Sequence, residues 1–270
     1  MEKPMRRITV FVSIFVLVFL IFSATRDTLA SFAWQKYRSA PFALALVRDD
    51  AEIAMNIGDY FFGGGGYNLG LSEQAYQKAL VVAPGILWGH YQIARIRFVR
   101  GEYELALKEI EGELLSNPAN LRSLYVRGLI YAYRGAPGDL LLAENDFMQF
   151  IAWAPTEWAG YNDLAWIFIR EEKYGQAIEA VDKAFANAHG AEENPWLWNM
   201  KGVAELNLEK YGRAEVSFSR ASALALALHE AEWRKAYPGN ASADATEGLK
   251  QFRDSITKNL EKTRLELVAK

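Results

Sequence analysis

The chain has 270 residues, of which 51% are hydrophobic, and its net charge is −3. A chain of this length and apolar content can bury a sizeable core, and its charge gives no electrostatic reason to expect nucleic acid as a partner. It contains no cysteine, which excludes disulfides, thiolate metal sites and cysteine nucleophiles. Gly and Pro are sparse outside turn-like clusters while Ala, Leu and Glu are plentiful, so the composition predicts an all-α protein.

The N-terminus combines a basic tip with a long apolar run. Lys3, Arg6 and Arg7 precede a segment without charge that extends from Ile8 to Thr25. As a helix this segment spans about 27 Å, close to the ~30 Å hydrocarbon thickness of a bilayer. We therefore predict that residues 1–25 form a cytoplasmic tip and a transmembrane signal anchor, with everything after the anchor outside the cytoplasm, periplasmic or external.

Two other interpretations of this segment remain open. A cleaved signal peptide, giving a secretory form, is compatible with a small-x-small site at 28–30, although Arg26 and Asp27 separate that site from the apolar run. The segment could also be a buried core helix. Residues 26–50 are expected to form a helical connector, with helices over 26–38 and 41–50 separated at Pro41 and a helix start at Asp49 and Asp50.

Three columns of residues recur with a base period of 34 from residue 51 onward. The first holds small residues: Ala94, Gly128, Ala165 and Gly202. The second is Ser72, Ala106, Ala143, Ala177 and Ala214, and the third marks unit ends at Pro84, Pro118 and Pro155, with His189 where the next proline would fall. Insertions of three residues lie in the turns at 135–139 and 192–195, and stacked hairpins tolerate insertions in such loops.

Each unit divides into two helices joined by a short turn. Small residues at fixed points let the two helices approach closely, and a large apolar residue beside them fills the groove. The predicted units within 51–238 are residues 51–86, 87–120, 121–157, 158–194 and 195–234. The second helix of the fifth unit is expected to continue to about Trp233 and to be interrupted at 238–240. Residues 239–270 then form an amphipathic capping helix with Leu249, Phe252, Ile256 and Leu260 on one stripe.

This pattern resembles the tetratricopeptide repeat family, which has 34-residue units with W-x2-L-G-x2-Y in the first helix, A-x3-F in the second and a closing proline. Residues 161–165 (Tyr-Asn-Asp-Leu-Ala) followed by Phe168 match the first-helix motif, whereas Arg127 and Lys201 occupy the usual leucine position and Glu113 a small-residue position. The resemblance implies a right-handed superhelical stack of about five helix-turn-helix repeats. An irregular helical bundle is the alternative.

The sequence shows no constellation that indicates catalysis. There is no His-x-x-x-His, Gly-x-Ser-x-Gly or Walker motif and no spaced acidic ligand set, so we predict no enzyme activity, no metal and no cofactor. Four glycines at 63–66 could suggest a phosphate cradle, but residues 67–69 (Tyr-Asn-Leu) do not supply the Lys-Ser/Thr that such a loop needs. We interpret them as a flexible turn between helices.

Binding is better supported, on the face of each first helix that lines the concave groove of similar stacks. The residues predicted to contact a partner there are Trp88, Tyr91, Arg95, Arg122, Tyr125, Leu129, Tyr133, Asn162, Trp166, Arg170, Asn199 and Val203, with Phe98 and Trp196 on the same face. Rigid aromatic area combined with side-chain donors is typical of peptide-binding surfaces, although some of these rings could instead pack between helices.

The leading hypothesis is a membrane-anchored extracytoplasmic scaffold that binds a peptide or a partner helix in its groove during assembly of an envelope complex. The alternative is a self-associating organiser or an accessory subunit of a membrane enzyme complex. The sequence identifies neither the partner protein nor the oligomeric state.

Overall fold

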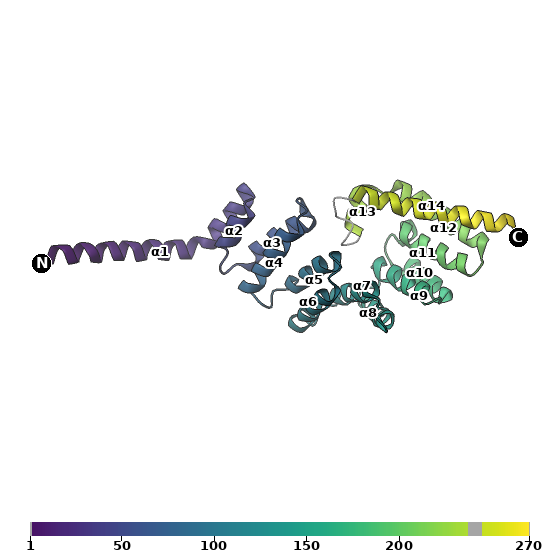
Figure 1. Ribbon diagram of the computed structural model, residues 1–270, viewed down its shortest axis with the longest axis horizontal. Helices are drawn as coiled ribbons and strands as arrows, with labels where there is room; N and C mark the ends of the chain where they lie inside the picture. The colour runs from purple at the N-terminus through teal and green to yellow at the C-terminus, as the bar shows by residue number, and fades with distance from the viewer. Residues whose placement is uncertain (1, 237–244, 270) are drawn as a thin grey trace. The chain divides into compact units, whose positions relative to one another are not determined.

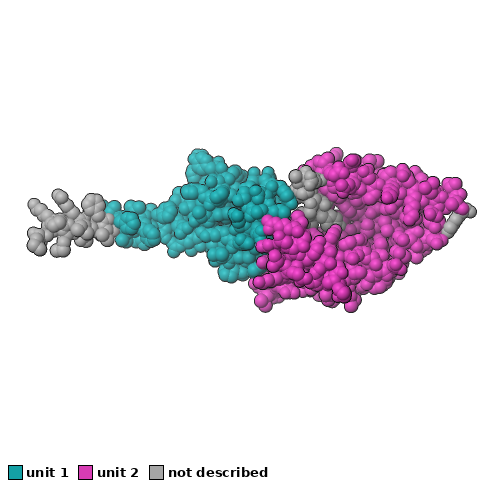
Figure 2. Space-filling model, viewed as in Figure 1, with its two compact units in different colours: residues 1–93 teal, residues 94–270 magenta. Residues whose placement is uncertain are grey.

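The structure is a computed structural model that describes residues 2–236 and 245–269 (Figure 1). The described residues form helices joined by short loops and contain no strand. They divide into two compact units, residues 1–93 and 94–270 (Figure 2), and the boundary falls inside one helix. The two units are described one at a time below.

The first unit begins with one long helix, α1 (Glu2–Tyr37). Its large apolar side chains from Ile14 to Phe22 are exposed, whereas Ala30, Ala33 and Trp34 are buried within the unit. By length and composition alone, α1 is apolar enough to cross a membrane. The sequence separated an anchor from a connector helix at residue 25, but the helix continues without a break through that point. The short helix α2 (Ala40–Leu46) follows, with Pro41 in its first turn, where the missing N–H costs no helical hydrogen bond.

Arg26 and Asp27, the charges that follow the apolar run, fasten α1 to the loop after α2. The Arg26 guanidinium donates to the carbonyl oxygens of Leu46 (3.2 Å) and Ala45 (2.9 Å), which are free because they lie at a helix C-terminus. The Asp27 carboxylate accepts from the backbone N–H groups of Arg48 (2.8 Å) and Asp49 (3.0 Å). The apolar part of α1 is therefore continuous with a helix that is packed and hydrogen-bonded within the first unit.

The first hairpin of the stack consists of α3 (Ala51–Asp59) and α4 (Leu69–Val82). Asp50 caps α3 by accepting from the Glu52 N–H at 3.0 Å, as the sequence indicated. The glycine segment is not a simple turn, since Tyr60–Gly64 forms a π-helical turn that extends α3. Asn68 then caps α4 by accepting from the Leu71 N–H at 3.0 Å.

The second unit stacks further hairpins in chain order. The helix α5 (Gly89–Val99) crosses the unit boundary and is followed by α6 (Tyr103–Ser116). The pairs α7 (Arg122–Arg134) with α8 (Asp139–Trp153), α9 (Trp158–Arg170) with α10 (Tyr174–Asn187), and α11 (Pro195–Asn207) with α12 (Tyr211–Ala227) are packed along their lengths. The insertion at 192–195 is accommodated by a 3₁₀ turn, η2 (Ala191–Glu193), and by Asn194 as the cap of α11.

The two small-residue columns lie where the paired helices come closest. Each glycine of the first column faces an aromatic ring on the paired helix, four residues after the small residue of the second column. A methyl group at Gly128 would lie 2.8 Å from Phe147 Cε1, and one at Gly202 would lie 2.7 Å from Phe218 Cδ1. Where the first column holds alanine, the corresponding residue is aliphatic: Ile110 for Ala94 and Val181 for Ala165. All four of these larger side chains are fully buried, so a smaller residue on the first helix is compensated by a larger side chain on the second.

The C-terminal region differs from the expected continuous helix. The helix α12 ends at Ala227, and a separate helix, α13 (Glu230–Ala236), carries Trp233. The interruption expected at 238–240 lies outside the described residues. The last helix, α14 (Ala245–Ala269), packs against α12 with Leu249 and Ile256 buried.

Candidate interaction face

The residues singled out from the sequence lie on α5, α7, α9 and α11, except Trp88, which lies in the turn before α5. In the second unit, α9 contacts both α7 and α11, and we call the surface on these three helices the first-helix face. Arg122, Tyr125, Leu129 and Tyr133 lie on α7, Asn162, Trp166 and Arg170 on α9, and Asn199 and Val203 on α11. Trp88 and Tyr91 belong to the first unit, where their rings meet edge to face with the centroids 5.0 Å apart. Arg95 is half-buried and lies at the start of the second unit.

Several of these side chains are buried among the helices. Tyr91, Tyr125, Leu129, Asn162 and Asn199 are each less than 9% exposed. The Tyr125 hydroxyl donates to Asp163 Oδ2 at 2.8 Å, and Asn162 Nδ2 donates to Asp163 Oδ1 at 3.0 Å. This network joins α7 to α9 and satisfies a carboxylate that is 5% exposed. A partner that contacted Tyr125 would have to displace this packing, which leaves partner contact at these buried positions a prediction.

Three other predicted residues form an accessible array. Tyr133 is 54% exposed, and its ring lies 5.2 Å from the Trp166 ring. The Arg170 guanidinium lies 5.1 Å from the Trp166 centroid and donates to the Ala132 carbonyl oxygen at 2.5 Å. Phe98, on α5, also meets the Tyr133 ring edge to face, with the ring centroids 5.2 Å apart. The structure therefore brings an aromatic ladder and a positioned cation together across consecutive repeats.

A second aromatic cluster lies at the start of α11 and includes residues that the groove positions did not predict. Trp196 stacks on Trp158 at 5.4 Å, on Phe252 at 5.3 Å and on Trp233 at 5.9 Å, with interplanar angles below 20°. Phe252 was expected only as part of the capping stripe, and Trp233 only as the end of a longer helix. Both come from the C-terminal helices α13 and α14, so the cap itself contributes rings to this end of the first-helix face.

Polar groups complete the face. Arg122 forms an ion pair with Glu157, with Nη2 and Oε1 3.2 Å apart. The Oδ1 atom of Asn199 is buried and accepts no hydrogen bond from the part of the chain that the structure describes. One turn further along α11, Val203 is half-buried.

No family model and no curated protein sequence matches the chain. Among solved structures, it is similar to PilW, a type IV pilus biogenesis factor, with a TM-score of 0.58 and 13% identity over 78% of this chain and 92% of that one. It is also similar to TTC0263, a thermophilic TPR protein of Thermus thermophilus, with a TM-score of 0.55 and 15% identity over 77% of this chain and 99% of that one. A third is YrrB, described as a TPR protein with an unusual peptide-binding site, with a TM-score of 0.52 and 14% identity over 69% and 92% of the two chains. These likenesses establish the tetratricopeptide-type fold.

Proposed function

We propose that this protein is a membrane-anchored extracytoplasmic scaffold that binds a peptide or a partner helix along its first-helix face during assembly of an envelope complex. The observation that carries the proposal is the accessible array of Tyr133, Trp166 and Arg170. Rigid rings supply large contact area at low conformational cost, and the guanidinium adds donors of fixed geometry.

The anchored location is supported by α1. Its exposed apolar side chains suit the hydrocarbon core of a bilayer, and the basic residues at the start of the chain favour a cytoplasmic N-terminus. Among proteins of similar fold, YrrB has a peptide-binding site and PilW acts in pilus biogenesis, which fits a binding role at the cell envelope. A topology reporter fused after Lys270 tests the location, and a cytoplasmic signal from it would contradict the proposal.

The binding proposal is tested with the double variant Tyr133→Ala/Trp166→Ala in the full chain. Tyr125 is unsuitable because its loss would break the buried network with Asp163. Each aromatic anchor contributes on the order of 1–2 kcal/mol to an interface, so the variant should reduce recovery of the partner from detergent-solubilised native membranes by at least tenfold.

The matched control is Trp153→Ala, which removes a ring about as exposed as Tyr133 from the end of α8, outside the array of Tyr133, Trp166 and Arg170. Recovery should be unchanged in this control. Equal recovery with the double variant, at an unchanged helical circular dichroism spectrum and melting temperature, would refute binding through this array.

A further inference from the structure

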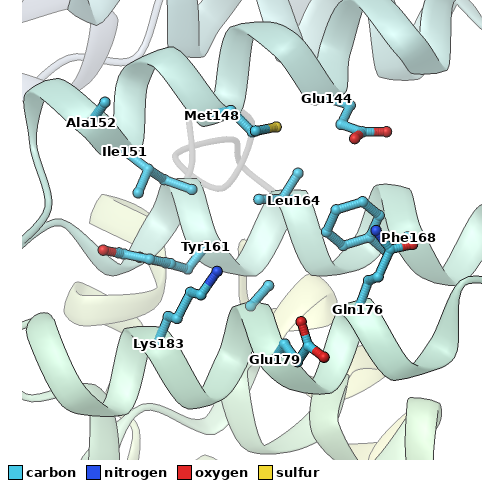
Figure 3. Close-up of a pocket in the computed structure, with 11 residues that line it drawn as sticks. Glu144, Met148, Ile151, Ala152, Tyr161, Leu164, Phe168, Gln176, Glu179 and Lys183 are labelled. Atoms are coloured by element: carbon cyan, nitrogen blue, oxygen red, sulfur yellow. The ribbon is translucent and has the colours of Figure 1, made fainter.

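An apolar groove opens between α8, α9 and α10 in the second unit (Figure 3). Its volume is about 340 Å³, and its apolar lining is formed mainly by Met148 and Ile151 of α8 and by Tyr161, Leu164 and Phe168 of α9. Leu164 and Phe168 are each 7% exposed, whereas Met148 at the edge is 53% exposed. Two helices thus form the walls of the groove and α9 forms its floor. The groove uses none of the residues predicted for partner binding on the first-helix face.

The repeats on either side show why the groove is open at this place. Leu164 has Arg127 at the corresponding position of α7 and Lys201 at that of α11. The Arg127 guanidinium forms two hydrogen bonds to Asp146, at 2.8 and 2.7 Å. The Lys201 ammonium bonds to Asp182 at 2.5 Å. In both neighbouring repeats a cation at this position therefore bonds to an adjacent helix, α8 for Arg127 and α10 for Lys201. At the same position α9 has Leu164, which forms no such bond.

The substitution at Leu164 is accompanied by one on the wall of the groove. Asp182, the partner of Lys201, has Met148 as its counterpart on α8. The Lys201 ammonium also lies 5.5 Å from the centroid of the Phe185 ring and 5.9 Å from that of Trp198, and the two rings themselves are 4.6 Å apart. In the following repeat the corresponding surface therefore carries the Lys201–Asp182 ion pair next to the packed rings of Phe185 and Trp198. The α8–α10 groove has an exposed apolar edge instead.

The rim of the groove on α10 carries two opposite charges, Glu179 and Lys183, which lie one helical turn apart. Glu144 and Gln176 lie toward one end of the groove, Glu179 near its middle and Lys183 toward the other end (Figure 3). Glu144 is already paired with Lys173 at 3.3 Å. The Glu179 carboxylate and the Lys183 ammonium are both exposed, and neither forms an ion pair within the described residues. These two charges are therefore available to an occupant.

We propose that this groove docks an amphipathic α-helix of a partner protein. The channel between two helices accepts apolar side chains spaced at i, i+3 or i+4, and i+7 from a third helix, the arrangement of helix-in-groove recognition. Charge complementarity fixes the direction, with a Lys or Arg of the partner opposite Glu179 and an Asp or Glu opposite Lys183. The site is separate from the first-helix face and does not depend on a ligand there.

The test places a photoreactive benzophenone amino acid at Gln176, on the rim, in the full chain within native membranes. Irradiation should give an adduct whose partner segment, sequenced by mass spectrometry, has an apolar stripe at helical spacing flanked by a basic and an acidic residue one turn apart, to face Glu179 and Lys183. The same probe at Gln149, exposed on α8 but outside the groove, is the control and should give at most a tenth of the adduct.

The decisive variant is Met148→Asp/Leu164→Lys, which installs the ion pair that the next repeat uses and should lower the adduct at least tenfold. A second variant, Glu179→Lys/Lys183→Glu, reverses two exposed charges without touching the core and should also lower it severalfold. Tyr133→Ala/Trp166→Ala should leave the adduct unchanged, which separates this proposal from the function proposed above. No adduct above the Gln149 level, an adduct with lipid or with a second copy of this chain, or an adduct insensitive to both groove variants would overturn the proposal.

Discussion

The pairing of Gly128 with Phe147 gives a quantitative test of how the hairpins are held together. A methyl group at Gly128 would lie 2.8, 3.0 and 3.1 Å from three carbons of the Phe147 ring. Optimal carbon–carbon contacts lie at about 3.5–4.0 Å, so the ring would have to move by roughly 0.7 Å. Phe147 is fully buried and has no open side to move toward.

The expected energies follow from this geometry. Overpacking costs about 1–3 kcal/mol, and the better helix propensity of alanine returns about 1 kcal/mol, so Gly128→Ala should destabilise by up to ~2 kcal/mol. Phe147→Val leaves a cavity and should cost about 2–3 kcal/mol. The double variant reproduces the Ala165 and Val181 pair of the next repeat, and its methyl group fills part of the cavity. Its cost should therefore be at least ~1 kcal/mol below the sum of the single variants.

The assay is urea denaturation of the full chain in detergent micelles, followed by helical circular dichroism. The matched control is Gly175→Ala, because a methyl group there meets no atom within 4 Å. This control should be neutral or stabilising by up to ~1 kcal/mol. If the costs of Gly128→Ala and Phe147→Val in free energy of unfolding simply add in the double variant, the volumes of the two side chains do not compensate each other and the reasoning is refuted.

Three further predictions concern polar groups. The Arg134 guanidinium and the Ala136 N–H bond to the buried Asp139 carboxylate and lower its pKa. Asp139→Asn should therefore lower the free energy of unfolding by about 2 kcal/mol at pH 7. Because the pKa of Asp139 is lowered on folding, its carboxylate stabilises the fold above the unfolded pKa of ~3.9, and this stabilisation is lost as the pH falls through the folded pKa. The difference between variant and parent should therefore shrink at low pH, measured by urea denaturation at several pH values. Tyr125→Phe removes a donor from buried Asp163 and should cost about 1–2 kcal/mol by the same measurement, while an unchanged midpoint would contradict the network. Asn194→Ala removes the cap that accepts from two N–H groups of α11 and should cost about 1 kcal/mol, seen as a lower melting temperature.

The repeat architecture is readable from the sequence because packing constrains it at a fixed period. Small residues at Gly128 and Ala165 recur where two helices must approach, and loops absorb the insertions. The fold class is confirmed by the helical hairpins and by the similarity to solved tetratricopeptide structures. The continuity of α1 was not predictable in the same way, because Arg26 and Asp27 look like the end of an apolar helix. Their partners, in the loop after α2, are tertiary contacts that a local pattern does not contain.

The exposure of individual site residues was less predictable than their place on a helix. Helical periodicity assigns a residue to a side of its own helix, but exposure also depends on neighbours that are distant in sequence. Tyr125 is buried because Asp163, one repeat away, accepts its hydroxyl, whereas Tyr133 on the same helix stays exposed. Trp196 stacks on Phe252 and Trp233 because the chain returns over the last hairpin.

The helix α9 supports both proposed surfaces because its side chains leave in opposite directions. Trp166 lies two residues after Leu164, which is a rotation of about 200° around the helix axis. Tyr161, Leu164 and Phe168, at helical spacing, line the groove with α8 and α10, whereas Trp166 and Arg170 join Tyr133 of α7. Asp163, between these two faces, is buried and accepts hydrogen bonds from Tyr125 of α7 and from Asn162, so α9 is fixed to its neighbour there. An occupant of one surface does not contact the residues of the other. The two proposals together predict that one repeat holds two partners at the same time, which a single groove does not allow.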